Sequence, residues 1–262
     1  MKFVIPVDLS NESSEVLLHT AKNMKNSGCE IVLFHTVEPS AIGSASMINL
    51  SDIIMEELEK SLSNLKQEIE SVLSSTETVK TIIKNGVFEY MLVNVTENEH
   101  PDLILFLSKN RKSPEKLLSR KHALQILGKI HQPFIILPPK QQLWPVRNIG
   151  LAIDAREEPS KVTMDSLKKI STFFGAELKP FHIDTLGGVT PDYYRNESTA
   201  VETDAEFEPN VLMGISNWCD NQNIDLLTIV TQPKNFLEKL FKLSITKELI
   251  QKGERPILVM TQ

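Results

Sequence analysis

The stretch Pro101-Asp102-Leu103-Ile104-Leu105-Phe106 recurs later in the same chain as Ile224-Asp225-Leu226-Leu227-Thr228-Ile229. The two aspartates lie 123 positions apart (225 − 102). Two other motif pairs keep this offset: Glu115-Lys116-Leu117-Leu118 with Glu238-Lys239-Leu240-Phe241, and Gln132-Pro133-Phe134-Ile135-Ile136-Leu137 with Arg255-Pro256-Ile257-Leu258-Val259-Met260. Chance matches between apolar runs would not keep one offset across three separated motifs. The sequence therefore contains an internal repeat, which predicts two copies of one structural unit.

The beginnings of the two copies also correspond, at larger offsets. Val7-Asp8 matches Ile153-Asp154 at an offset of 146, and 28–35 matches 175–182 at an offset of 147. We interpret this change as one residue inserted in or beside the first helix. The later fall from 147 to 123 means that the second copy lacks 24 residues in its middle (147 − 123), about one long helix and a turn.

A long amphipathic helix in the first copy accounts for those residues, and we predict it over 48–74. Its apolar side chains recur at steps of three or four, the spacing of one helical face: Ile54, Leu58, Leu62, Leu65, Ile69 and Val72. The second copy has 187–192 and an acidic stretch, 202–208, in its place. We expect a loop or hairpin there.

Short apolar strands alternate with helices in both halves, which predicts parallel sheets with right-handed crossovers. The predicted strands are 2–8, 30–36, 78–84, 102–107 and 133–138, then 147–153, 177–183, 199–203, 225–230 and 256–261. The predicted helices are 11–27, 48–74, 88–98 and 114–130, then 157–174, 208–221 and 235–251. Ser113 with Pro114, and Asn235 with Glu238, are typical of helix starts.

These elements predict an α/β fold with two tandem five-stranded parallel-sheet sandwich domains. The first domain is expected over 1–139 and the second over 147–262. The segment 140–146 is the predicted linker, because Pro138 and Pro139 cannot continue a central strand. The second domain is expected to lack one helix.

The composition excludes several classes of protein. The chain has 262 residues, of which 41% are hydrophobic and 24% charged, so it is globular. Its net charge of −6 gives no general attraction to nucleic acid or to an anionic membrane. No apolar run is long enough to span a bilayer. The two cysteines, Cys29 and Cys219, form no CxxC motif, and we expect reduced thiols in a cytoplasmic protein.

The pattern resembles the universal stress protein family in tandem form. The resemblance rests on Ile5-Pro6-Val7-Asp8-Leu9-Ser10-Asn11-Glu12-Ser13, on Glu30-Ile31-Val32-Leu33-Phe34-His35-Thr36-Val37, and on the block 101–137 with its repeat. It implies the adenine-nucleotide alpha hydrolase-like fold of that family, whose members commonly dimerise. It therefore implies an intramolecular pseudo-dimer in which the two domains pack through their last strands. Two such chains could pair further as a homodimer.

The resemblance also locates a candidate nucleotide site. ATP-binding members have an Asp at the end of strand one and a G-x-x-G, nine residues, G-S/T segment after strand four. Glycines there let backbone N–H groups approach phosphate. The matching positions here are Asp8, Leu107, Asn110 and Arg120-Lys121 in the first half, and Asp154, Val230, Pro233 and Leu243-Ser244 in the second. All the glycines are replaced; only Ser244 keeps the hydroxyl, and only Asn110 readily tolerates positive φ.

Each candidate site has a structural alternative. Six basic residues could hold a phosphate-rich ligand by charge, or form a solvated helix face: Lys109, Arg111, Lys112, Lys116, Arg120 and Lys121. Asp8 and Asp154 could contact a ligand at the sheet edge, or bond their own backbone in a turn. The equivalent His35 and His182 could suggest a metal, but no ligand-spaced Cys or carboxylate accompanies them, so packed histidines and no metal are expected.

The sequence therefore predicts a non-catalytic, cytoplasmic binding and regulatory protein of the stress response with degenerate ATP-binding motifs and no cofactor. No Walker A, G-x-S-x-G, H-E-x-x-H or G-x-G-x-x-G motif occurs. The alternative is a nucleotide- or phosphate-ligand-binding protein with weak ATPase activity through Asp8 or Asp154. A third reading is an interaction module in which the long helix and the acidic stretch 202–208 are docking surfaces.

Overall fold

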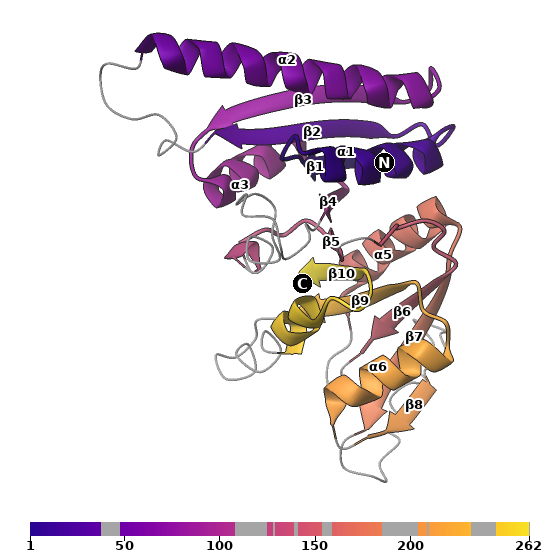
Figure 1. Cartoon of the computed structure of the whole chain (residues 1–262). Coiled ribbons are helices and arrows are strands. Elements are labelled where there is room, and N and C mark those ends of the chain that lie inside the picture. Colours follow the sequence, from indigo (N-terminus) through magenta and orange to yellow (C-terminus); the bar gives the residue numbers. More distant parts are fainter. Residues whose placement is uncertain are drawn as a thin grey trace. The chain divides into compact units, whose positions relative to one another are not determined.

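The computed structural model describes residues 1–37, 48–107, 125–127, 129–138, 141–153, 159–184, 204–208, 210–231 and 245–261. These residues belong to two compact units, Met1–Trp144 (unit 1) and Pro145–Gln262 (unit 2), which follow one another along the chain in Figure 1. The predicted helix starts at Ser113 and Asn235 lie outside the described residues, as do most of the helices 114–130 and 235–251.

Unit 1 is a parallel sheet with helices between its strands. Its elements are β1 (Lys2–Pro6), α1 (Asn11–Met24), β2 (Glu30–Val37), α2 (Ile48–Val72), β3 (Thr78–Asn85), α3 (Phe88–Glu99), β4 (Leu103–Leu107) and β5 (Phe134–Leu137). The strand order is β3-β2-β1-β4-β5, and every described pairing is parallel. The long helix α2 runs beside the edge strand β3 in Figure 1.

Unit 2 repeats this connectivity. Its elements are β6 (Asn148–Ala152), α5 (Lys161–Phe174), β7 (Glu177–Asp184), β8 (Asp204–Phe207), α6 (Val211–Asn221), β9 (Leu226–Thr231) and β10 (Ile257–Thr261), with a further helical stretch at 245–252. The strand order is β8-β7-β6-β9-β10, again parallel. The predicted α/β fold class of two five-stranded parallel sheets is confirmed.

The central strands are covered on both faces, as their continuous apolar sequence predicts. Phe3, Val4 and Ile5 of β1 are all buried, although successive side chains point to opposite faces. Right-handed crossovers in this strand order place α1 and α2 on one face and α3 on the other. On the α3 face, Phe34 stacks on Phe88 with ring centroids 6.1 Å apart.

The repeat extends to individual backbone hydrogen bonds. Val7 N donates to Phe34 O at 2.8 Å in unit 1, and the equivalent Ile153 N donates to Phe181 O at 2.9 Å in unit 2. The residue that directly follows the first strand of each unit is thus held to the second strand in the same way.

The first helix of the repeat corrects one sequence interpretation. Ser10 caps α1 and Ser160 caps α5, and both helices have 14 residues, so they correspond at an offset of 150. Unit 2 therefore has four more residues before this helix (150 − 146) and three fewer after it (150 − 147). The interpretation of one inserted residue was wrong in detail. The sequence offsets show only the net difference of one residue, which is the sum of the two larger changes.

The acidic stretch of unit 2 was also partly misread. It contributes the strand β8, which pairs parallel with β7 from Phe181↔Asp204 to Asp184↔Phe207; the predicted strand 199–203 lies outside the described residues. An acidic strand is tolerated because β8 is at the sheet edge. The following helix begins at Val211, later than predicted, because the Asn210 side chain caps it by accepting from the backbone N of Leu212 and of Met213.

The cores of the two units differ at one pair of equivalent positions. At equivalent positions unit 1 has Val4 and Val95, both buried, whereas unit 2 has Gly150 and Trp218. The indole of Trp218 stacks on Phe181 with centroids 3.8 Å apart. A Cβ atom at Gly150 would lie only 3.1 Å from this indole, so the glycine makes room for the tryptophan.

Candidate functional site

The carboxyl end of β1 carries Asp8, the first candidate ligand contact. Its Oδ1 accepts hydrogen bonds from the backbone N of Ser10 at 3.0 Å and from Ser10 Oγ at 2.7 Å. This arrangement is an Asx turn, in which an aspartate binds the backbone two residues further on. Ser10 in turn caps α1 by accepting from Ser13 N at 3.3 Å. Asp8 therefore shapes the loop, and its ligand role stays a prediction.

Leu9, between these two residues, has a left-handed backbone conformation with φ of 59°. This conformation costs a residue with a Cβ atom about 1–2 kcal/mol. The Asx turn and the helix cap on either side hold the residue in place. No sequence signal marks this position, because leucine is not typical of left-handed turns.

His35 and His182 hold the same position in the two units. Nδ1 of His35 donates to Val7 O at 2.8 Å, and Nδ1 of His182 donates to Ile153 O at 3.1 Å. Each ring therefore fixes the carbonyl that precedes the candidate aspartate of its unit. Both are packed, hydrogen-bonded histidines, as the structural alternative predicted.

The first position of the phosphate-binding segment holds a bulky residue in both units. Leu107 is buried at the end of β4, and Val230 lies at the equivalent place in β9. Their neighbours in register are Leu137 and Met260, which are also equivalent. The remaining candidates lie outside the described residues: Asn110, Arg120, Lys121, Asp154 and Ser244.

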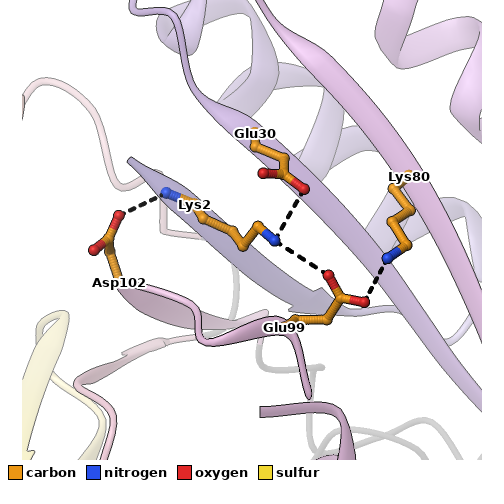
Figure 2. A network of polar contacts seen from close by, with 5 residues as sticks. All are labelled: Lys2, Glu30, Lys80, Glu99 and Asp102. Carbon is orange, nitrogen blue, oxygen red and sulfur yellow. Dashed lines mark hydrogen bonds and ion pairs between the residues drawn. The ribbon is translucent and has the colours of Figure 1, made fainter. Parts of the chain in front are cut away.

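An ion network ties together the amino end of the unit 1 sheet (Figure 2). Lys2 Nζ lies 3.1 Å from Glu30 Oε1 and 3.2 Å from Glu99 Oε2, and Lys80 Nζ bonds the other oxygen of Glu99. The backbone N of Lys2 donates to Asp102 Oδ2 at 2.8 Å. The hydrogen bond from Lys80, opposed by burial and aided by Lys2, lowers the pKa of Glu99.

Unit 2 keeps only part of this arrangement in the described residues. Asp225, equivalent to Asp102, accepts from the backbone N of Arg147 at 2.8 Å and of Asn148 at 3.0 Å. Asn148 is at the position equivalent to Lys2, and Gln222 is at the position equivalent to Glu99. The aspartate clamp thus belongs to the repeat, whereas the ion network belongs to unit 1.

A carboxylate that the sequence did not single out, that of Glu77, is buried between α2 and β3. Its Oε1 accepts from Gly28 N at 2.9 Å and Thr76 Oγ1 at 2.8 Å; its Oε2 accepts from Ser74 N at 3.0 Å and Ser74 Oγ at 2.7 Å. Burial raises the pKa of Glu77, but these hydrogen bonds outweigh it and lower the pKa to about 2. The hydroxyl run before Glu77 was the available signal, but Gly28 lies far away in sequence.

The described residues contain no group of three or more His, Cys, Asp or Glu side chains that could hold a metal ion. Burial raises the pKa of the Cys219 thiol to about 12 and also raises the pKa of Cys29, so neither is an activated nucleophile. A cavity in unit 2, lined by α6, β9 and the segment 249–257, has a volume of about 10 Å³. This volume suits one water molecule and no larger ligand.

Comparisons with known proteins agree with this architecture. A sequence profile described as the Universal stress protein family matches residues 1–138. A universal stress protein from Archaeoglobus fulgidus is similar over 99% of this chain and 98% of its own, with 18% identity and a TM-score of 0.75. A putative universal stress protein from Pseudomonas aeruginosa is similar over 99% and 92%, with 12% identity and a TM-score of 0.59.

A protein of unknown function from Pseudomonas aeruginosa PAO1 also shares the fold, over 99% of this chain and 92% of its own, with 11% identity and a TM-score of 0.60. At these identities the solved structures show the fold alone. No curated protein matches the sequence. Among the described helices, none combines the length and apolar character needed to cross a membrane.

Proposed function

This chain belongs to the universal stress protein family, and on that premise we propose that it is a non-catalytic binding and regulatory protein of the cytoplasmic stress response. The family match covers unit 1. We propose that unit 2 is a divergent copy of the same domain, since its strand order and strand-end hydrogen bonds repeat those of unit 1. The pairing of the two units as an intramolecular pseudo-dimer is part of this proposal.

The replacement of glycine at the phosphate-binding segment carries the proposal. The segment of ATP-binding members needs backbone N–H groups that approach phosphate without a Cβ in the way. Here its first position is the buried Leu107 in unit 1 and Val230 in unit 2. In addition, one oxygen of Asp8 is engaged by Ser10. These features disfavour tight ATP binding and ATP hydrolysis.

A second candidate function rests on the basic run of unit 1. Six lysines and arginines occur within 109–121, where the phosphate segment of the family would lie, and half as many occur at the equivalent place in unit 2. Side-chain cations can bind phosphate without glycines. This candidate is a nucleotide- or phosphate-ligand-binding protein with weak ATPase activity.

Thermal unfolding of the full chain with ATP, ADP, AMP and inorganic phosphate distinguishes the two. The non-catalytic proposal expects no rise in Tm with millimolar ATP and Mg²⁺, and no release of phosphate over hours. A rise that grows with ATP concentration would indicate binding to the folded chain. If that rise disappears in Arg120→Ala/Lys121→Ala but persists in the matched exposed pair Lys22→Ala/Lys25→Ala, the second candidate replaces the first.

A further inference from the structure

The turn between α2 and β3 connects an exposed hydroxyl to a buried carboxylate. Thr76 is exposed, yet its Oγ1 donates to Glu77 Oε1 at 2.8 Å and lies 2.8 Å from Ser74 Oγ. Glu77 itself is only 8% exposed. A chemical change at the surface of this turn is therefore felt directly by an interior group.

Glu77 holds this turn against a segment far away in sequence. Its Oε1 also accepts from the backbone N of Gly28, which precedes Cys29, a residue only 1% exposed. Thr78 N donates to Cys29 O at 3.1 Å directly beside this contact. We call Gly28, Ser74, Thr76 and Glu77 the clasp, because these contacts fix the α2–β3 turn to the start of β2.

We propose that Thr76 is a phosphorylation site and that phosphate on its hydroxyl opens the clasp and exposes Cys29. The reaction is transfer from a nucleoside triphosphate by a serine/threonine protein kinase. Thr76 Oγ1 forms a bond to the γ-phosphorus, the β–γ phosphoanhydride bond breaks, and the nucleoside diphosphate leaves. The hydroxyl proton passes to the general base of the kinase. This regulation is independent of the ligand questions at the other edge of the sheet.

The electrostatics of the clasp explain why this modification would have a large effect. A phosphate carries a charge of about −1.5 to −2 and its ester oxygen no longer donates a hydrogen bond. Glu77 stays ionised at neutral pH because its pKa is about 2. Two lysines at the amino end of the sheet, Lys2 and Lys80, are held by Glu30 and Glu99. Repulsion from the phosphate acts on Glu77 Oε1, the oxygen that also accepts from Gly28 N, and therefore weakens the contact between the turn and Gly28.

The test uses Cys29 as a reporter in the full chain carrying Cys219→Ala, which leaves one thiol. We expect Thr76→Glu to increase the rate of Cys29 labelling by a thiol reagent about tenfold or more. Ser75→Glu is the matched control, because Ser75 is the exposed neighbour and is not a clasp donor. We expect it to leave the rate within about twofold. In the Glu77→Gln background, Thr76→Glu should have a much smaller effect, because no carboxylate remains to repel.

Hydrogen exchange separates clasp opening from unfolding. Opening predicts lost protection at 27–31 and 73–79, with β4 and β5 still protected. Equal effects of Ser75→Glu and Thr76→Glu, or loss of protection throughout unit 1, would overturn the proposal. Mass spectrometry of the native chain after starvation should find phosphate on Thr76 in the tryptic peptide 67–80. Phosphate only on the other hydroxyls of that peptide, or none, would also overturn it.

Discussion

Unit 1 and unit 2 have the same strand order but are stabilised by different side chains. Unit 1 joins its strands at the amino end through Lys2, Glu30, Glu99 and Lys80, as Figure 2 shows, and has the buried valines Val4 and Val95 in its core. Unit 2 replaces the ion network and places Trp218 in the core instead. What both retain are contacts to the backbone. The backbone pattern therefore defines this fold, and side-chain charge and volume vary around it.

Substitutions at Gly150 and Trp218 in the core of unit 2 should have the largest effect on stability. Trp218→Val should destabilise unit 2 by about 3–5 kcal/mol through the cavity beside Phe181. Gly150→Val should cost about 1–3 kcal/mol through overpacking against the indole. The double variant recreates the valine pair of unit 1, and we expect it to be more stable than Trp218→Val alone. Denaturant titration followed by hydrogen exchange of β6 and β7 measures this for unit 2 specifically.

The control for this exchange is the same measurement on unit 1. Hydrogen exchange of β1 and β2 should be unchanged in all three variants, because the two units have separate cores. If the double variant loses as much stability as the two single variants together, Gly150 and Trp218 do not compensate each other. That result would contradict the proposed exchange between the two cores.

Removal of the clasp carboxylate is the next largest effect. Glu77→Gln should destabilise unit 1 by about 2 kcal/mol at pH 7, since charged hydrogen bonds to Gly28, Ser74 and Thr76 are weakened. Folding lowers the Glu77 pKa from 4.5 to about 2. Its stabilisation is therefore complete above pH 4.5 and is lost as the pH falls toward 2. Urea titrations at pH 7, 4 and 2.5 should show the two proteins converging; a constant difference would contradict this.

The aspartate clamps test what the two units share. Asp102→Ala and Asp225→Ala should each cost about 1–2 kcal/mol in their own unit, because each leaves a backbone N–H without its acceptor. Asp102→Asn and Asp225→Asn are the milder controls, since an amide oxygen still accepts. Thermal unfolding combined with hydrogen exchange at the starts of β1 and β6 gives both values. A cost in only one unit would show that the clamp is not a common feature.

Removal of Lys80, at the exposed end of the ion network, should have the smallest effect on stability. Lys80 is about half exposed, and an ion pair of this kind contributes at most about 1 kcal/mol. Lys80→Met should therefore lower the stability of unit 1 by about 0.5 kcal/mol or less at low salt, with no difference at 1 M NaCl. Lys84→Met on the same strand is the matched control. A larger, salt-independent loss would mean that the lysine contributes through packing.

Much of this fold could be predicted from the sequence, because the repeat and the apolar periodicity are local patterns. Apart from β8, the described strands and helices agree with prediction to within about four residues. The replacement of the first motif glycine by Leu107 and Val230 was visible directly in the sequence. The clasp was not predictable, because Glu77 meets Gly28 only after folding. The role of Trp218 was not predictable from the sequence, since its fit to Gly150 depends on strand register. Asp154, Asn110, Arg120, Lys121 and Ser244 lie outside the described residues.

The shift between α1 and α5 has a consequence for how such a duplicated domain can be re-engineered. Unit 2 has four more residues before this helix and three fewer after it than unit 1 has. Both helices nevertheless have 14 residues, and equivalent positions face the sheet. Buried positions of α1 and α5 still correspond, as with Leu17 and Leu167. The connection at the carboxyl edge can thus change in length while the helix and sheet are kept, which makes the segment before α1 a natural place to insert residues into unit 1.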